Sequence, residues 1–144
     1  MLNVYQMAML DFLTSQIFLT IVACWGVAKV IKGSIRLSRG WKFGDISQPG
    51  GFPSEHTAFV VGMFFATAFE TSWDPVLTSI TAVVAIVVMY DATHVRYQTE
   101  LHAKILNKIG NLEEKLKETH GHTYFEVFSG VVIALLVSLV SYYL

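Results

Sequence analysis

The sequence predicts an all-α integral membrane protein: a four-helix bundle with an amphipathic interfacial helix inserted before the last span. Two observations predict this fold. Hydrophobic residues make up 53% of the 144 residues and charged residues only 15%, and the mean hydropathy of +0.52 is high for a soluble domain. The apolar residues also gather in four runs separated by polar segments, as expected for helices that cross a bilayer. A chain of this length fits one domain, residues 1–144.

The predicted spans lie at about 14–33, 53–70, 75–91 and 122–143. The second is short for a span, so we expect its first turn at or just inside the interface. The third is rich in β-branched residues, but a lone strand cannot satisfy its backbone in lipid, so a helix is expected. Residues 92–118 carry apolar positions at spacings of three and four with lysines between them. They predict an amphipathic helix on the membrane surface or against a partner helix, broken near Gly110.

Basic residues are confined to one end of this bundle. If the four spans run up and down, all ten Lys and Arg residues and all five histidines fall at one end, and the other end carries only acidic charges. The positive-inside rule then places the basic end in the cytoplasm and both termini outside. We expect the plasma membrane of a prokaryote. The simplest interpretation is that these cations set the topology and contact anionic headgroups. The net charge of −1 gives no bias toward nucleic acid, and no nucleic-acid partner is expected.

The segment Gly50–Thr57 (GGFPSEHT) directly precedes the second apolar run. Pro53 suits the start of a helix, so Ser54, Glu55 and His56 would lie in the first turn, where free N–H groups favour an anion. The two glycines would let the backbone approach a ligand closely. The segment therefore predicts a phosphate site at the membrane edge. The alternative is a helix start with an incidental histidine.

Other polar residues at this end supply what a metal-free phosphoester hydrolysis requires. Such a reaction needs cations around the phosphate, a nucleophile oriented by a carboxylate, and an acid for the leaving oxygen. His122 and Glu126 are four apart, so the carboxylate can orient the imidazole. His56 would be the acid and Ser54 would contact phosphate oxygens. The candidate cations are Lys29, Lys32, Arg36, Arg39 and Arg96; Lys29 with Arg36, or equally Lys32 with Arg39, would share one helix face.

Three stretches together resemble the divergent branch of the type 2 phosphatidic acid phosphatase superfamily, relatives of the vanadium haloperoxidases: GGFPSEHTAFVVG (50–62), VVMYDATHVR (87–96) and GHTYFEVFSG (121–130). The superfamily's signatures are K-x6-R-P, P-S-G-H and S-R-x5-H-x3-D. Residues 53–56 look like the second, and Arg96 with His122-x3-Glu126 looks like the third, split by an insertion. Either lysine–arginine pair can stand for the first. The resemblance implies His122 as nucleophile, Glu126 as its orienting carboxylate, His56 as acid, a phosphohistidine intermediate, and no metal or cofactor.

The chain departs from these signatures at several points. Glu55 stands where the signature has glycine, no proline follows Arg36 or Arg39, and Glu126 replaces aspartate. A carboxylate at position 55 would repel a bound anion unless it turned away or paired with a cation. Integral members of the superfamily commonly have six spans and a site facing away from the cytoplasm, whereas this sequence predicts four spans and a cytoplasmic site.

Several alternatives remain open at this point. Asp91 could act as a base or metal ligand, or could form a structural ion pair with a lysine or Arg96. His120 and His122 could form a metal-ligand pair, although their spacing matches no recognised zinc pattern. The leading function is a membrane phosphatase acting on a lipid phosphate or pyrophosphate. The alternatives are a catalytically silent membrane protein that binds anionic lipid or a partner protein, and a small transporter or channel, for which four spans suffice only in an oligomer. A homodimer is a further alternative, for which the sequence identifies no interface.

Overall fold

A computed structural model describes residues 3–42, 44, 48, 50–110, 114–118 and 121–144, and its regular structure there is entirely helical. The all-α fold predicted from the sequence is confirmed. In chain order the elements are α1 (Val4–Leu13), α2 (Gln16–Ser38), α3 (Glu55–Glu70), α4 (Pro75–Tyr90), the π-helical turn η2 (Asp91–Val95), α5 (Arg96–Ile109) and α6 (Tyr124–Tyr143).

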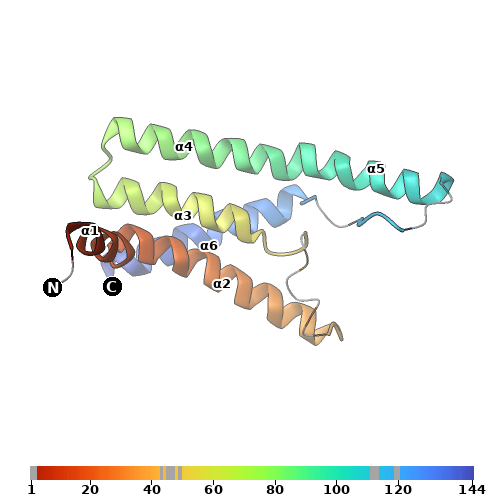
Figure 1. Ribbon diagram of the computed structural model, residues 1–144, viewed down its shortest axis with the longest axis horizontal. Helices are drawn as coiled ribbons and strands as arrows, with labels where there is room; N and C mark the ends of the chain where they lie inside the picture. Colours follow the sequence, from red (N-terminus) through yellow and green to blue (C-terminus); the bar gives the residue numbers. More distant parts are fainter. Residues whose placement is uncertain (1–2, 43, 45–47, 49, 111–113, 119–120) are drawn as a thin grey trace.

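The bundle consists of α2, α3, α4 and α6, and α3 packs against the other three (Figure 1). Both chain termini lie at one end of the bundle (Figure 1). The opposite end gathers the end of α2, the starts of α3 and α6, and the junction of α4 with α5. These four segments are the ones that carry the basic residues and histidines, and the sequence predicted that they share one end of the bundle. We call this end of the bundle the basic end.

Local sequence explains where the helices begin. Ser15, Ser54 and Thr123 cap α2, α3 and α6 by accepting a backbone N–H in the first turn, and Asp74 caps α4 ahead of Pro75. Small residues let the helices approach closely. A Cβ atom added at Gly62 of α3 would lie 2.8 Å from the Sγ atom of Cys24 in α2, so only glycine fits at this crossing.

Three helical segments among the described residues are long and apolar enough to cross a membrane: Gln16–Ser38, Pro75–Ile109 and Tyr124–Tyr143. With 16 residues, α3 is about 24 Å long at 1.5 Å per residue. This length is less than the roughly 30 Å of a hydrocarbon core. The second predicted span is therefore the short member of the bundle, and its N-terminal turn lies among the polar residues of the basic end.

The region predicted as a separate interfacial helix, 92–118, is organised differently. α4 continues through η2 directly into α5 as one helical segment (Figure 1). No Gly or Pro interrupts residues 91–109, so the chain has no local signal for a turn there. α5 is amphipathic, as predicted, and it ends at Ile109 with Gly110 as its cap. Residues 114–118 return along α5, because the side-chain amide of Asn107 bonds both the N–H and the carbonyl of Leu116.

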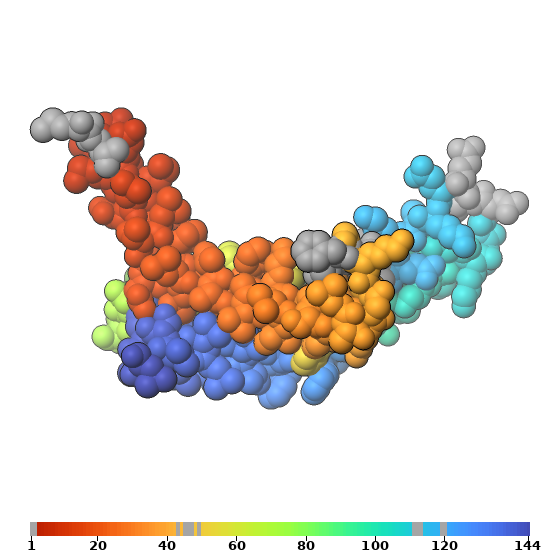
Figure 2. Space-filling view, turned by 90° about the horizontal axis from the view of Figure 1, so that it is seen from below, coloured from red at the N-terminus to blue at the C-terminus, as the bar shows by residue number. Residues whose placement is uncertain are grey.

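Two segments project from the ends of the bundle toward the same side, which gives the molecule an open U shape (Figure 2). One is α1, whose apolar residues are exposed. The other is α5 with residues 114–118. The basic end lies where α5 leaves the bundle, so one wall of any site there is supplied by this projecting helix.

Candidate functional site

The starts of α3 and α6 lie side by side. The N–H of Ser54 donates a 3.1 Å hydrogen bond to the carbonyl of Glu126. A Cβ atom added at Gly130 would lie 2.6 Å from the carbonyl oxygen of Ser54, so the two helices touch backbone to backbone. His56 and His122, each a few residues from this contact, therefore share one end of the bundle.

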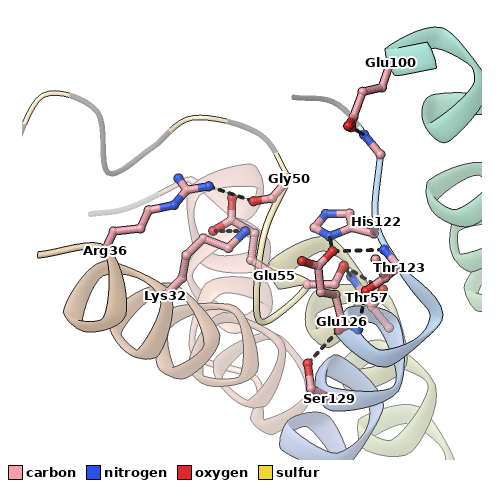
Figure 3. Close-up of polar contacts among 12 residues, drawn as sticks. Lys32, Arg36, Gly50, Glu55, Thr57, Glu100, His122, Thr123, Glu126 and Ser129 are labelled. Carbon is pink, nitrogen blue, oxygen red and sulfur yellow. Dashed lines mark hydrogen bonds and ion pairs between the residues drawn. The ribbon is translucent and has the colours of Figure 1, made fainter. Parts of the chain in front are cut away.

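His122 and Glu126 form a side-chain pair at the basic end (Figure 3). His122 is 5% exposed, and its Nδ1 atom lies 3.2 Å from Oε2 of Glu126. The same oxygen accepts the N–H of Thr123 at 3.0 Å, while the Thr123 hydroxyl accepts the N–H of Glu126. This capping box fixes the carboxylate, and the carboxylate in turn fixes the imidazole. A carboxylate at Nδ1 favours the tautomer with its proton there, which leaves the lone pair of Nε2 available.

A cavity of about 290 Å³ adjoins this pair. His122, Thr123 and Glu126 line one side, and Arg36 and Arg39 from the end of α2 line another. Tyr97 and Glu100 from α5, with Trp41 and Phe52 from the segment between α2 and α3, complete the wall. The cavity's charged lining is thus two guanidinium groups and two carboxylates, and one of the carboxylates is already bonded to the histidine.

Arg36 reaches the cavity wall through the loop that precedes α3. It is 8% exposed, and its guanidinium donates to the carbonyls of Gln48 and Gly50, both at 2.8 Å. Gly50 and Gly51 have φ values of 76° and 80°, a conformation that favours glycine. A Cβ atom at Gly51 would lie 3.1 Å from Nη2 of Arg36. The two glycines therefore bring the backbone close to the Arg36 guanidinium. From the sequence we expected them to bring the backbone close to a ligand instead.

Lys32 and Glu55 form a buried ion pair beside this wall (Figure 3). The Nζ atom of Lys32 lies 3.7 Å from Oε2 of Glu55, and the two side chains are 2% and 13% exposed. Glu55 is the residue that stands where the phosphatase signature has glycine. From the sequence we expected its carboxylate to repel a bound anion unless it turned away or paired with a cation. It pairs with a cation, Lys32.

The remaining predicted site residues are spread around this centre. The Nζ atom of Lys29 lies 4.5 Å from the centre of the Trp25 ring, and it does not line the cavity. Ser54 is fully buried and its hydroxyl caps α3, 2.9 Å from the Thr57 hydroxyl. His56 is exposed in the first turn of α3, within electrostatic range of Lys32, Arg96 and His122.

Asp91 and Arg96 pair with each other through Oδ2 and Nε, at the surface of η2. Of the two interpretations of Asp91, the ion pair with Arg96 is the one observed. Neither residue lines the cavity. Within the described ranges, no group of three or more His, Cys, Asp or Glu side chains could hold a metal ion. His120, half of the alternative ligand pair with His122, lies outside the described residues.

Sequence reasoning missed the residues that hold His122 in place from η2 and α5. Glu100 accepts the N–H of Gly121, and the carbonyl of Ala92 in η2 accepts the N–H of His122. The only local signal was the spacing of Glu100 and Lys104, four apart, which predicts an ordinary surface pair on a helix. Nothing in that spacing indicates that the carboxylate also bonds a residue 21 positions later.

These features define a class: a helical membrane bundle with a buried histidine–carboxylate pair beside an arginine-lined cavity at one end. The Divergent PAP2 family matches residues 13–137, so the chain belongs to that family. It is 30% identical over 155 aligned positions to the uncharacterized membrane protein YuiD of Bacillus subtilis (strain 168), covering 93% of this chain and 98% of that protein. No solved structure matches the chain. The protein is therefore an integral membrane member of a divergent PAP2-related branch.

Proposed function

We propose that this protein is a membrane phosphatase that hydrolyses a lipid phosphate or pyrophosphate through a phosphohistidine on His122, without metal. The observation that carries the proposal is the bond between His122 and Glu126. A carboxylate fixed by a helix cap holds Nδ1, and the nucleophilic lone pair then belongs to Nε2. The histidine is buried at the wall of a cavity and on the end of the bundle where a lipid phosphate would reach it.

The reaction would proceed in two displacements. Nε2 of His122 attacks phosphorus, the bond from phosphorus to the lipid oxygen breaks, and His56 gives a proton to the departing oxygen. A water molecule then attacks the phosphohistidine, His56 takes its proton, and the P–N bond breaks to release phosphate. With a pyrophosphate substrate the first leaving group is the lipid monophosphate. Arg36 and Arg39 on the opposite wall would stabilise the charge on the phosphoryl oxygens.

Phosphate release by the detergent-purified full chain tests this proposal. The assay uses phosphatidate and a polyprenyl diphosphate with a chelator present. His122→Ala should lose activity, and the phosphorylated intermediate should be trapped as an acid-labile, base-stable adduct in the wild type but not in this variant. His102→Ala is the matched control, because His102 is exposed on α5 and does not line the cavity. If His122→Ala releases phosphate as fast as the control, the assignment of His122 is wrong.

The Lys32–Glu55 ion pair favours a second function. The carboxylate of Glu55 already pairs with Lys32, one of the cations expected to bind phosphate. In this second function the protein binds anionic lipid or a partner protein without catalysis. The two functions differ in one measurement. A silent protein releases no phosphate from either substrate, yet it binds vesicles containing anionic lipid more tightly than neutral ones, and removing Glu55 changes that binding.

A further inference from the structure

Residues 121 and 122 are docked on the projecting helix by three contacts in addition to the bond to Glu126. The N–H of Gly121 donates to Oε2 of Glu100 at 3.1 Å. The N–H of His122 donates to the carbonyl of Ala92 at 3.0 Å. A Cβ atom at Gly121 would lie 2.6 Å from the Cα atom of Tyr97, so glycine lets the backbone rest directly on α5. The two successive N–H groups are therefore both held by the α4–α5 helix.

The π turn accounts for one of these contacts. In η2 the N–H of Arg96 bonds the carbonyl of Asp91, five residues earlier, instead of four as in an α-helix. Such a turn widens the helix locally, and π turns of this kind occur frequently at functional sites. The carbonyl of Ala92 lies inside this widened turn and has two lone pairs, so it can accept a bond from outside the helix.

Glu100 supplies the other contact from about two turns further along the helix than Ala92. Its side chain is 17% exposed and its Oε1 atom pairs with Lys104. Its second oxygen, Oε2, is the one that holds Gly121. Glu100 also lines the cavity beside His122 (Figure 3). Lys104 thus holds one oxygen of the Glu100 carboxylate, and the other oxygen holds Gly121, the residue before His122.

The geometry points to Glu100 as a positioning residue for His122, acting through the backbone of Gly121. This inference rests on the proposed function, because it gives His122 the role of nucleophile. In-line attack requires the reacting atoms to be about 3–3.5 Å apart, and a misplacement of 1 Å can cost on the order of 100-fold in rate. Releasing Gly121 from α5 loosens the residue adjoining the nucleophile but removes no group that touches the phosphate. The turnover number therefore falls while the Michaelis constant stays the same.

The test compares Glu100→Gln and Glu100→Ala with Glu118→Gln in the full-length protein. Glutamine has nearly the same shape and keeps an oxygen that can accept the Gly121 N–H, whereas alanine has none. Glu118 is the matched control, because it lies on the same projecting segment, does not line the cavity, and accepts a hydrogen bond from the side-chain amide of Asn107. Two readouts are measured: the steady-state constants for phosphate release, and the rate at which His122 is carbethoxylated by diethyl pyrocarbonate, followed by mass spectrometry.

We expect kcat to fall about 10- to 100-fold in Glu100→Ala with KM within twofold of wild type. Glu100→Gln should recover a large part of that loss, and Glu118→Gln should match the wild type. His122 is only 5% exposed, so loosening the backbone beside it should speed its labelling. The labelling rate should rise most in Glu100→Ala, less in Glu100→Gln and not at all in Glu118→Gln. Unchanged kcat and labelling in Glu100→Ala overturn the inference, and so does a rise in KM alone, which indicates a substrate contact. If the wild type releases no phosphate, the proposed function fails, while the labelling rates still decide whether Glu100 holds His122.

Discussion

The N–H of Ser54 bonds the carbonyl of Glu126 at 3.1 Å, and this contact joins the cap of α3 to the first turn of α6. His56 follows Ser54 by two residues and His122 precedes Glu126 by four. One backbone contact thus fixes where two distant imidazole-bearing segments lie relative to each other. The contact depends on close approach of the helices, because Gly130 lies against the carbonyl of Ser54.

Gly130→Ala is expected to destabilise the protein. The added Cβ atom would meet the carbonyl oxygen of Ser54 at 2.6 Å and Cβ of Thr57 at 2.9 Å, and a backbone carbonyl cannot move aside as a flexible side chain can. Overpacking of this kind costs about 1–3 kcal/mol. Thermal unfolding in detergent measures the loss. Gly26→Ala is the control, because a Cβ atom there has nothing within 4 Å. Equal melting temperatures for the two variants would contradict the close contact.

Glu126→Gln separates the two roles of this residue. Glutamine can complete a capping box, so α6 should still form and the melting temperature should change little. The charge that orients His122 is lost, and we expect phosphate release to fall about 100-fold or more. Thr123→Ala is the complementary variant, because it removes the cap hydroxyl at a cost of about 1 kcal/mol while Glu126 keeps its charge. A fully active Glu126→Gln protein would show that His122 needs no carboxylate.

The features that the sequence predicted correctly are those carried by local spacing. Four apolar runs predict helices, and the i, i+4 spacing of His122 and Glu126 predicts their contact because both lie at one helix start. The charge asymmetry predicts which helix ends meet. Each of these inferences needs only the geometry of a helix and the up-and-down order of the chain.

The features that the sequence did not predict depend on how distant segments meet. Ala92, which accepts a bond from His122, lies in a π turn, and the sequence carries no residue that marks such a turn. Arg36 bonds loop carbonyls, and Lys32 pairs with Glu55, because α2 extends as one helix to Ser38 beside the loop before α3. The continuity of α4 with α5 has a local cause instead, because no Gly or Pro interrupts residues 91–109.

Variants of Arg39 and Lys29 test which of the two lysine–arginine pairs left open by the sequence binds the phosphate. Arg39 lines the cavity, whereas Lys29 lies over the ring of Trp25. We therefore expect Arg39→Ala to raise KM for the phosphorylated substrate about tenfold or more, since a charge-assisted hydrogen bond contributes about 1.5–3 kcal/mol. Lys29→Ala should leave KM unchanged. Steady-state kinetics in mixed micelles measures both. The reverse result would assign the first motif to Lys29 with Arg36.

The Lys32–Glu55 pair makes a prediction about anion binding that does not depend on catalysis. In Glu55→Gly, Lys32 keeps its burial but loses its partner, and breaking a buried pair costs about 3–5 kcal/mol. A phosphate or vanadate ion that enters beside Lys32 would replace the missing charge. The variant should therefore melt at a lower temperature than the wild type without anion, and gain more stability than the wild type when anion is added, by RT ln(1 + [L]/Kd).

Glu114→Gln is the control for this experiment, because it removes an exposed carboxylate from the segment 114–118. It should respond to the anion as the wild type does. If Glu55→Gly loses stability but gains none from phosphate, vanadate or tungstate, then the space beside Lys32 does not admit an oxyanion. The ion pair would then be a structural link between α2 and α3, and phosphate binding would have to rely on Arg36 and Arg39 alone. If the gain is present, Glu55 competes with the anion for Lys32, and its removal should also raise the rate of phosphate release.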